Sequence, residues 1–275
     1  MYNFNGKLNS TTPIIMGILN VTEDSFYDGG KYTTETAVLE RATQILSEGG
    51  DIIDIGAMST RPNALEIPED EEISRIVKAV KVVREKFPEA VLSIDTYRAS
   101  VAKAAVEAGA DMINDISGGT FDPDMIPTVG ALQVPFCLMH TTAKPSDMQQ
   151  HTEYNDILAD MLQFFSQQLE KLHAHYVHDI IIDPGFGFGK TLEQNYFLMD
   201  NLEVFQQLGL PILVGISRKS MIYKLLGTTP DGALNGTTVL NTIALMKGTD
   251  ILRVHDVKEA VEVRKILRNF SKKTS

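Results

Sequence analysis

The sequence has almost no cysteine: a single residue, Cys137, among 275. One thiol excludes a disulfide framework within the chain, and no set of Cys and His residues has the spacing of a zinc site. Cys137 lies in the apolar run Val134-Pro-Phe-Cys-Leu-Met139. In that context a buried thiol is expected rather than a nucleophile.

An excess of positive charge is also lacking. The 25 Lys and Arg residues are outnumbered by 36 Asp and Glu residues, and the formal net charge is −11. Because such a chain repels polyphosphate backbones, nucleic acid is not expected to be its main partner.

Long hydrophobic runs are absent as well. No apolar stretch approaches the ~20 residues that a membrane span needs, and hydrophobic residues make up 43% of the chain, which is typical of a globular protein. The N-terminal stretch Met-Tyr-Asn-Phe-Asn-Gly-Lys lacks the basic start and apolar block of a signal peptide. We therefore expect no membrane association and a cytoplasmic location.

What the sequence does contain is a regular series of short apolar runs. They are rich in Ile, Val and Leu without clean polar alternation, as expected of parallel strands covered on both faces. The eight runs are Pro13–Asn20, Asp51–Ala57, Ala90–Thr96, Asp111–Ser117, Val134–His140, Asp179–Gly185, Pro211–Ser217 and Ile251–Val257.

Segments with helical periodicity separate these runs, for example Ala37–Leu46 and Ile73–Val83. Proline followed by acids at Pro68–Glu72 is typical of a helix start. Glycines stand where helix C-caps are expected, at Gly49, Gly109 and Gly209.

Eight strands alternating with helices, without a linker, predict one α/β domain over residues 1–275 with a single (β/α)8 TIM-barrel fold. An open, Rossmann-type sheet of six or seven strands is the alternative, because the spacing of strands does not reveal whether a sheet closes.

Chemistry in a (β/α)8 barrel gathers at the C-terminal ends of the strands and in the loops that follow them. The sequence puts two polar groups there. The acidic set is Asp95, Asn114 and Asp183, and the cationic set is Arg61, Arg218, Lys219, Arg253 and His255. Further polar residues at these ends are Asn20, Asp54, Thr60, Asp115, His140, Ser217 and Asp256.

The two sets predict different ligands. Five cationic side chains on one face of an acidic protein indicate a site for phosphate or diphosphate, although each alone could cap a helix or pair with a surface acid. Buried carboxylates need donors, and the N–H edge of an aminopyrimidinone supplies them in pairs. Backbone N–H groups, Arg218 or Lys219 could satisfy Asp95 and Asp183 instead.

The segment after the first run, Val21–Gly30, combines carboxylates, a hydroxyl, an aromatic ring and a Gly-Gly end. It is typical of a mobile lid that brings oxygen ligands over an anion. Asn20 and Asp28 are candidate Mg²⁺ ligands, because this ion typically takes one or two protein oxygens and completes its shell with phosphate and water. An ordinary surface loop is the alternative.

Two stretches resemble a nucleotide-binding loop and a metal site, but their residues or their position do not fit these functions. Asp183-Pro-Gly-Phe-Gly-Phe-Gly-Lys-Thr191 misses the P-loop pattern at Pro184 and the dinucleotide pattern at Lys190, so Lys190 is expected to order the loop and not to bind phosphate. His173-Ala-His-Tyr-Val-His178 resembles a metal cluster, but it closes a helix at the N-terminal face of the barrel.

Eight groups of residues follow one another along the chain, each at its own strand end. They are Met16–Thr22 with Asp24–Phe26 and Asp28–Gly30, Asp54–Gly56 with Ser59–Pro62, Ser93–Thr96, Ile113–Ile116, Leu138–His140, Asp183–Lys190, Ser217–Ser220 and Arg253–Asp256. In this order, along nearly the whole chain, they resemble the dihydropteroate synthases, a family of pterin-binding barrels.

The resemblance implies a transferase of folate biosynthesis that condenses 6-hydroxymethyl-7,8-dihydropterin diphosphate with para-aminobenzoate and releases pyrophosphate. It also implies Mg²⁺ as cofactor, held by Asn20 and Asp28, and a homodimer through outer helices late in the barrel. The implied pterin-binding residues are Asp95, Asn114, Asp183, Lys219, Met139, Gly215 and Phe188. Those implied for the diphosphate are Asn20, Thr60, Arg61, Arg253 and His255. Those implied for aminobenzoate are Phe26, Thr60, Pro62, Phe188, Lys219 and Ser220.

The chain departs from the family pattern in its loops. Ala57-Met58 stands where Gly-Glu is usual, Asn63 where glycine is usual and Glu23 where proline is usual, and Thr141–Pro145 replaces a Met-Gln-Gly-type run. These departures concern the mobile loops and the binding of aminobenzoate more than the pterin site.

Two alternatives stay open. A methyltransferase on the same barrel would have no diphosphate to hold, so Ser217–Lys219 and Arg253–His255 favour the synthase. A non-catalytic pterin-binding paralogue is the other, and the retained Thr60, Arg61 and Lys219 argue against it.

Overall fold

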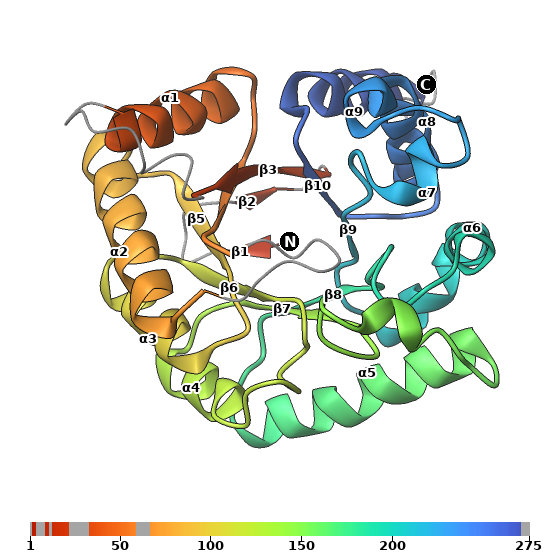
Figure 1. The fold of residues 1–275 in the computed structure, drawn as a ribbon, viewed down its shortest axis with the longest axis horizontal. Helices are drawn as coiled ribbons and strands as arrows, with labels where there is room; N and C mark the ends of the chain where they lie inside the picture. The colour runs from red at the N-terminus through yellow and green to blue at the C-terminus, as the bar shows by residue number, and fades with distance from the viewer. Residues whose placement is uncertain (1, 4–8, 11–12, 22–32, 59–66, 271–275) are drawn as a thin grey trace, which may run out of the picture.

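The computed structural model describes residues 2–3, 9–10, 13–21, 33–58 and 67–270, and these residues form an α/β barrel (Figure 1). The strands are β1 Tyr2–Asn3, β2 Asn9–Ser10, β3 Ile14–Asn20, β4 Ile52–Gly56, β5 Val91–Asp95, β6 Met112–Asp115, β7 Phe136–Met139, β8 Ile180–Asp183, β9 Leu213–Val214 and β10 Ile251–Val254. The α-helices are α1 Thr33–Ser47, α2 Glu69–Lys86, α3 Ala99–Glu107, α4 Met125–Leu132, α5 Ile157–Ala174, α6 Leu192–Asp200, α7 Ser220–Tyr223, α8 Leu234–Met246 and α9 Val257–Phe270. Short 3-10 helices are η2 Met148–Gln150, η3 Leu202–Leu208 and η4 Pro230–Ala233.

Strands β3 to β10 pair in parallel, in the order β8-β7-β6-β5-β4-β3-β10-β9. A parallel bridge between Ile182 and Ile212 joins the two ends of this order, and Ile182 N donates to Pro211 O at 2.9 Å. The sheet therefore closes, which confirms the predicted barrel and makes the open-sheet alternative wrong. Figure 1 shows the helices as an outer ring around the strands.

All eight predicted strands are present, each within or close to its predicted run. The shortest, β9, keeps two residues of Pro211–Ser217. The predicted helices over Ala37–Leu46 and Ile73–Val83 lie within α1 and α2. Helix α2 begins directly after Pro68, and Gly49, Gly109 and Gly209 have φ angles of 94°, 112° and 66°.

Two apolar layers cover the two faces of the sheet. One lies inside the barrel at its N-terminal end and consists of Ile14, Met16, Ile52, Val91, Met112, Cys137, Ile181, Leu213 and Ile251. The larger one lies between the strands and the helices and includes Ile53, Leu92 and Phe136. Cys137 is fully buried, and burial raises the pKa of its thiol well above the usual value, as expected of a packing residue.

Aspartates hold neighbouring strands in register at the N-terminal face of the barrel. Asp51, Asp111 and Asp250 each precede a strand directly. Each accepts a backbone N–H from a residue in, or directly before, the preceding strand of the chain. The donors are Ile15 N at 2.8 Å, Leu92 N at 2.9 Å and Ile212 N at 2.9 Å. Each of these carboxylates adds a bond that a slipped register would break.

Arg84 of α2 stabilises this face, and its replacement should destabilise the fold. Its guanidinium donates to Asp111 Oδ2 at 2.6 Å and to the carbonyl oxygens of Gly109, Pro88 and Ala90. Because a buried carboxylate loses its cation, Arg84→Met is expected to lower the free energy of unfolding by about 3 kcal/mol, measured by urea denaturation. Lys81→Met removes an exposed lysine from the same helix and should change it by less than ~0.5 kcal/mol. Equal effects of the two changes would contradict this account.

Candidate functional site

The site begins two residues beyond the inner apolar layer. Side chains alternate between the two faces of a strand, so residues two positions further on also point into the barrel. We call them the polar layer: Asp54, Ser93, Asn114, Met139, Asp183, Gly215 and Arg253. One more step of two leads to Asp95 and His255 at the C-terminal ends of β5 and β10.

Arg253 is the central cation of the polar layer. Its Nε donates to Asp54 Oδ2 at 2.6 Å and its Nη2 donates to Asp95 Oδ2 at 2.6 Å. Asp54 is fully buried and also accepts from Ser93 Oγ at 2.6 Å and Asn114 Nδ2 at 3.2 Å. One guanidinium therefore joins carboxylates from two strands, and the acidic and cationic sets of the sequence analysis meet in one network.

Asp95 is buried at the end of β5. Burial raises the pKa of its carboxyl to about 7, although Arg253 acts in the opposite direction. Asp183, at the end of β8, is also buried, and burial raises its pKa as well, while Lys219 lowers it. N–H donors of a bound ligand would favour the ionised form of both carboxyl groups and so lower their pKa values.

The loop after β8 folds back over Asp183. Gly185 N donates to Asp183 Oδ1 at 2.7 Å, and among the described residues Oδ2 accepts no hydrogen bond. Gly185 has φ 69°, and a Cβ at this position would lie 2.0 Å from the carbonyl oxygen of His140. Only glycine allows the turn that leaves one oxygen of Asp183 directed at the site.

Lys190 holds the same loop from inside, as the sequence predicts. Its buried ammonium donates to Gly185 O at 3.0 Å and Phe188 O at 2.9 Å, and lies 3.2 Å from His140 Nδ1. Burial lowers the pKa of Lys190 to about 7, and burial together with Lys190 lowers the pKa of His140 well below its usual value. Three neighbours occupy the three donors of an ammonium, so Lys190 orders the loop.

Lys219 and Phe188 contact each other at the side of the site. Lys219 Nζ lies 4.5 Å from the centre of the Phe188 ring and donates to Phe186 O at 2.6 Å. Burial lowers the pKa of Lys219 to about 8, while Asp183 raises it. Phe188 also belongs to an apolar cluster with Tyr97, Ile116, Met139 and Met148, packed by Met58, Phe121 and Ala143. A flat ring inserted here would meet an aromatic and aliphatic wall beside the polar layer.

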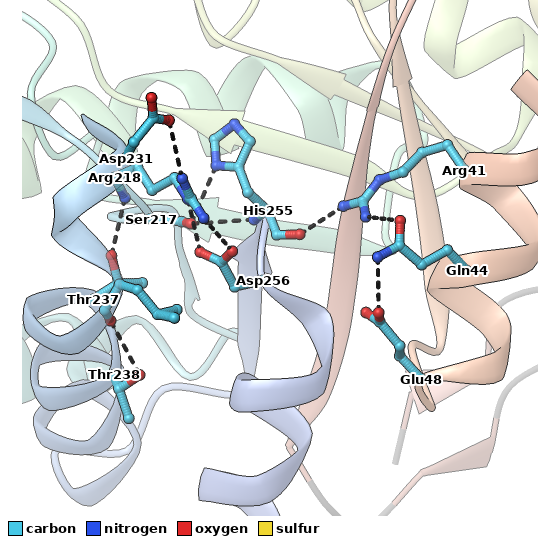
Figure 2. A network of polar contacts seen from close by, with 11 residues as sticks. Arg41, Gln44, Glu48, Ser217, Arg218, Asp231, Thr237, Thr238, His255 and Asp256 are labelled. Atoms are coloured by element: carbon cyan, nitrogen blue, oxygen red, sulfur yellow. Dashed lines mark hydrogen bonds and ion pairs between the residues drawn. The ribbon is translucent and has the colours of Figure 1, made fainter. Parts of the chain in front are cut away.

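His255 stands at the end of β10, next to the polar layer. Its backbone N donates to Ser217 Oγ at 3.1 Å, and its Nδ1 lies 3.1 Å from the same oxygen (Figure 2). Burial, with Arg253 next, lowers the pKa of His255 to about 4. At pH 7 the side chain is therefore neutral, and it would bind an anion as a hydrogen-bond donor instead of a cation.

Arg218 forms ion pairs with two aspartates. It donates to Asp256 through Nε at 3.0 Å and Nη2 at 2.7 Å, and its Nη1 lies 3.4 Å from Asp231 (Figure 2). This is the alternative that the sequence left open for each cationic residue alone. The cations that face the centre of the site among the described residues are Arg253 and Lys219.

The structure does not describe every predicted site residue. Phe26, Asp28, Thr60, Arg61 and Pro62 lie outside the described residues. Asn20 is the exposed last residue of β3, and Ser220 opens α7 directly after Lys219. The other predicted residues lie in the polar layer or next to it: Asp95, Asn114, Met139, Asp183, Phe188, Gly215, Lys219, Arg253 and His255.

A metal site is not formed by the described residues alone, because they hold no group of three or more His, Cys, Asp or Glu side chains suited to a metal ion. His173 lies in the last turn of α5, His175 is its C-cap and His178 follows the helix, with its ring stacked on that of His173 at 6.0 Å between the centroids. They thus stand at the helix C-terminus, as the sequence analysis expected. Across the described ranges, no helix has the length and apolar character needed to cross a membrane.

The sequence predicted Asp54 and Ser217 as polar residues at strand ends, but it assigned no individual partner to either of them or to Ser93. Asp54 is a carboxylate in an apolar strand, the same signal that singled out Asp95, and its step of two from Ile52 marks it as facing inward. Its partner Arg253 lies 199 positions away in the chain, so the pairing itself had no local signal.

Comparison with known proteins points to one family. A family model described as pterin binding enzyme matches residues 16–255. A dihydropteroate synthase of Synechocystis sp. is 43% identical over 256 residues, which are 92% of this chain and 88% of the relative. The structure of Yersinia pestis dihydropteroate synthase with a sulfonamide drug has a TM-score of 0.90 and 40% identity, with 97% of each chain covered. The structure of Xanthomonas albilineans dihydropteroate synthase with 4-aminobenzoic acid has a TM-score of 0.87 and 36% identity, with 96% of this chain and 94% of the other covered.

Two glycines of the site should respond differently to alanine. At Gly185 the added methyl group meets a backbone carbonyl oxygen at 2.0 Å, and φ is 69°. At Gly215 the nearest atom is Arg253 Cβ at 3.7 Å, an ordinary contact. Gly185→Ala is expected to lower the free energy of unfolding by at least ~2 kcal/mol, and Gly215→Ala by less than ~1 kcal/mol. Urea denaturation of the two variants checks this, and a stable Gly185→Ala protein would refute the loop geometry.

Proposed function

Since the chain belongs to the dihydropteroate synthase family of pterin-binding enzymes, we propose how its residues carry out the reaction of that family. It is a transferase that condenses 6-hydroxymethyl-7,8-dihydropterin diphosphate with para-aminobenzoate, forming 7,8-dihydropteroate and releasing pyrophosphate. Its synthase relatives disfavour a methyltransferase on the same barrel. The observation that supports the assignment of residues is the polar layer. There Arg253 binds the buried carboxylates of Asp54 and Asp95, and its strand ends next to His255.

The pterin is proposed to lie over the polar layer. Asp183 Oδ2 and the carboxyl of Asp95 would accept N–H groups of the pterin, and Asn114 would complete this hydrogen-bonding edge. Lys219 and Phe188 would border the ring, with Met139 against it and Gly215 leaving room for it. This fits the chemistry of the donors, because buried carboxylates with raised pKa values gain from paired N–H donors.

The diphosphate is proposed to bind at the ends of β3 and β10. Arg253 and His255 would contact it there, together with Asn20, Thr60 and Arg61. In the transition state the bond between the methylene carbon and the diphosphate oxygen breaks, and the leaving group gains charge. A guanidinium and a neutral imidazole N–H stabilise that charge, while the electron-rich dihydropterin stabilises the carbon.

Aminobenzoate is proposed to enter above Lys219 and Phe188, framed by Ser220 and by Phe26, Thr60 and Pro62. Its amine is a neutral nucleophile at pH 7, so it attacks the methylene carbon without a strong general base and then releases a proton to water.

Mg²⁺ is the proposed cofactor. Among the described residues Asn20 offers one exposed side-chain oxygen at the mouth of the barrel, which fits an ion that keeps most of its shell for phosphate and water. Asp28 is the second proposed ligand. When bound, the ion would neutralise charge on the diphosphate.

We also propose that the chain is one pterin-binding domain and that it forms a homodimer in the cytoplasm. Apolar side chains are exposed on helices late in the barrel, at Phe197 of α6 and at Val239 and Met246 of α8. Such side chains are suited to an interface between two copies.

The function and the role of Asp183 can be tested together. Purified protein with Mg²⁺, the dihydropterin diphosphate and para-aminobenzoate should release pyrophosphate; no release would refute the synthase assignment. Asp183→Asn should lower the turnover about 10- to 100-fold, because a charged acceptor is lost. Asp179→Asn changes an exposed aspartate beside the opposite end of β8 and should keep the wild-type rate. If the Asp183 variant also kept it, the proposed pterin site would be wrong.

Pterin affinity should depend on pH through Asp95. The carboxyl must be ionised to accept two N–H bonds, and its pKa is raised to about 7. The affinity for 6-hydroxymethylpterin is therefore expected to be about tenfold weaker at pH 6 than at pH 8, measured by calorimetry. Asp95→Asn should bind more weakly and lose most of this dependence; an unchanged dependence would assign it to another group.

A further inference from the structure

Ser217 meets His255 twice. Its Oγ accepts the backbone N–H of His255 at 3.1 Å, and the same oxygen lies 3.1 Å from the ring Nδ1. Ser217 is buried, with 4% of its surface exposed. A hydroxyl has one hydrogen to donate, and a buried hydroxyl normally finds an acceptor for it.

The hydrogen-bond partners of Ser217 Oγ decide whether Ser217 or His255 Nδ1 is the donor. Within the described ranges, the neighbours of Ser217 Oγ are the N–H group and the Nδ1 atom of His255. The N–H group is a donor, so Nδ1 is the acceptor available to the hydroxyl hydrogen. If Nδ1 carried a hydrogen instead, the hydroxyl hydrogen would have no acceptor among these residues.

The main chain of His255 is fixed from both sides. Arg41 of α1 donates from Nη2 to His255 O at 2.6 Å and from Nε to Ile18 O at 3.1 Å, which joins the ends of β10 and β3. On the other side, Arg218 binds Asp256 through two nitrogens. Figure 2 shows the ring of His255 between these groups, with one nitrogen toward Ser217 and the other directed away from it.

The surroundings also keep the imidazole neutral. Burial and the nearby guanidiniums of Arg253, Arg218 and Arg41 oppose its protonation, and Asp256 alone favours it. In a neutral imidazole one ring nitrogen carries the hydrogen and the other accepts. An acceptor at Nδ1 therefore means a donor at Nε2.

We infer that Ser217 is a positioning residue whose hydroxyl fixes His255 in the Nε2–H tautomer, so that a neutral ring donates a hydrogen bond to a bound diphosphate. This inference rests on the proposed function, because it needs the diphosphate to bind beside His255. It assigns Ser217 a role through His255 and no contact with the substrate. It also explains how a histidine among three guanidiniums contributes to anion binding without a charge.

The tautomer can be measured directly. In protein labelled with ¹⁵N-histidine at pH 7.5, the nitrogen spectrum of the His255 ring, assigned by comparison with His255→Asn, is expected to show the hydrogen on Nε2. Ser217→Ala should remove this preference, and Ser217→Thr, which keeps a hydroxyl, should restore it. A wild-type His255 with its hydrogen on Nδ1 would overturn the inference, whatever the variants do.

Affinity for inorganic pyrophosphate supplies the functional readout. By calorimetry, Ser217→Ala is expected to bind pyrophosphate about tenfold more weakly than the wild type, as for one misdirected hydrogen bond to an anion. Ser217→Thr should recover most of the affinity. Thr238→Ala, which removes a hydroxyl bonded to Leu234 O within α8, is the matched control and should bind as the wild type does.

The outcomes of these experiments distinguish the role of Ser217 from the proposed function. Unchanged pyrophosphate affinity in Ser217→Ala, in a protein that forms dihydropteroate, would overturn the role of Ser217 and leave the proposed function in place. A wild-type protein that forms no dihydropteroate would overturn the proposed function, and the nitrogen spectrum would still decide the Ser217–His255 tautomer.

Discussion

The arginine inside the barrel is the interaction on which the site depends. Arg253 lies between Asp54 and Asp95 at 2.6 Å from each, so one cation compensates two carboxylates that burial would otherwise make costly. Because Ser93 and Asn114 also donate to Asp54, strands β4, β5, β6 and β10 share one network. Loss of its cation would leave two buried acids facing each other, so charge balance, and not packing alone, fixes the geometry of this end of the barrel.

Along the strands, the inner apolar layer that stabilises the barrel and the polar layer that forms the site are two residues apart. In β4 and β10, Ile52 and Ile251 belong to the inner apolar layer, and the next inward positions are Asp54 and Arg253. The apolar layer excludes water below, which is why burial moves the pKa of Asp95 up to about 7 and that of Lys219 down to about 8. Groups whose pKa lies near 7 are common at functional sites. Here these pKa values follow from the position of the polar layer directly above the apolar layer.

Periodicity and turn residues were enough to predict the eight strands and to favour a barrel, because local patterns determine where strands form. Closure itself depends on the pairing of Ile182 with Ile212, which has no local signal. The site was predictable where one residue carried its own signal, as Asp183 does at the end of an apolar strand. It was not predictable where function depends on a partner far away in the chain: the pairing of Asp54 with Arg253 spans 199 positions. The neutral state of His255 was missed for the same reason, since it depends on burial and, besides Arg253 of the same strand, on Arg218 and Arg41 from distant parts of the chain.

The shared network also determines which residues of the site can change. Asp54 cannot change alone, because it accepts hydrogen bonds from Ser93, Asn114 and Arg253 on three other strands. The residues at the margin are less constrained: Met58 receives the Tyr97 hydroxyl at its Sδ at 3.7 Å and packs against the apolar cluster of Phe188. A change at Met58 would therefore leave the network of Arg253 with Asp54 and Asp95 intact.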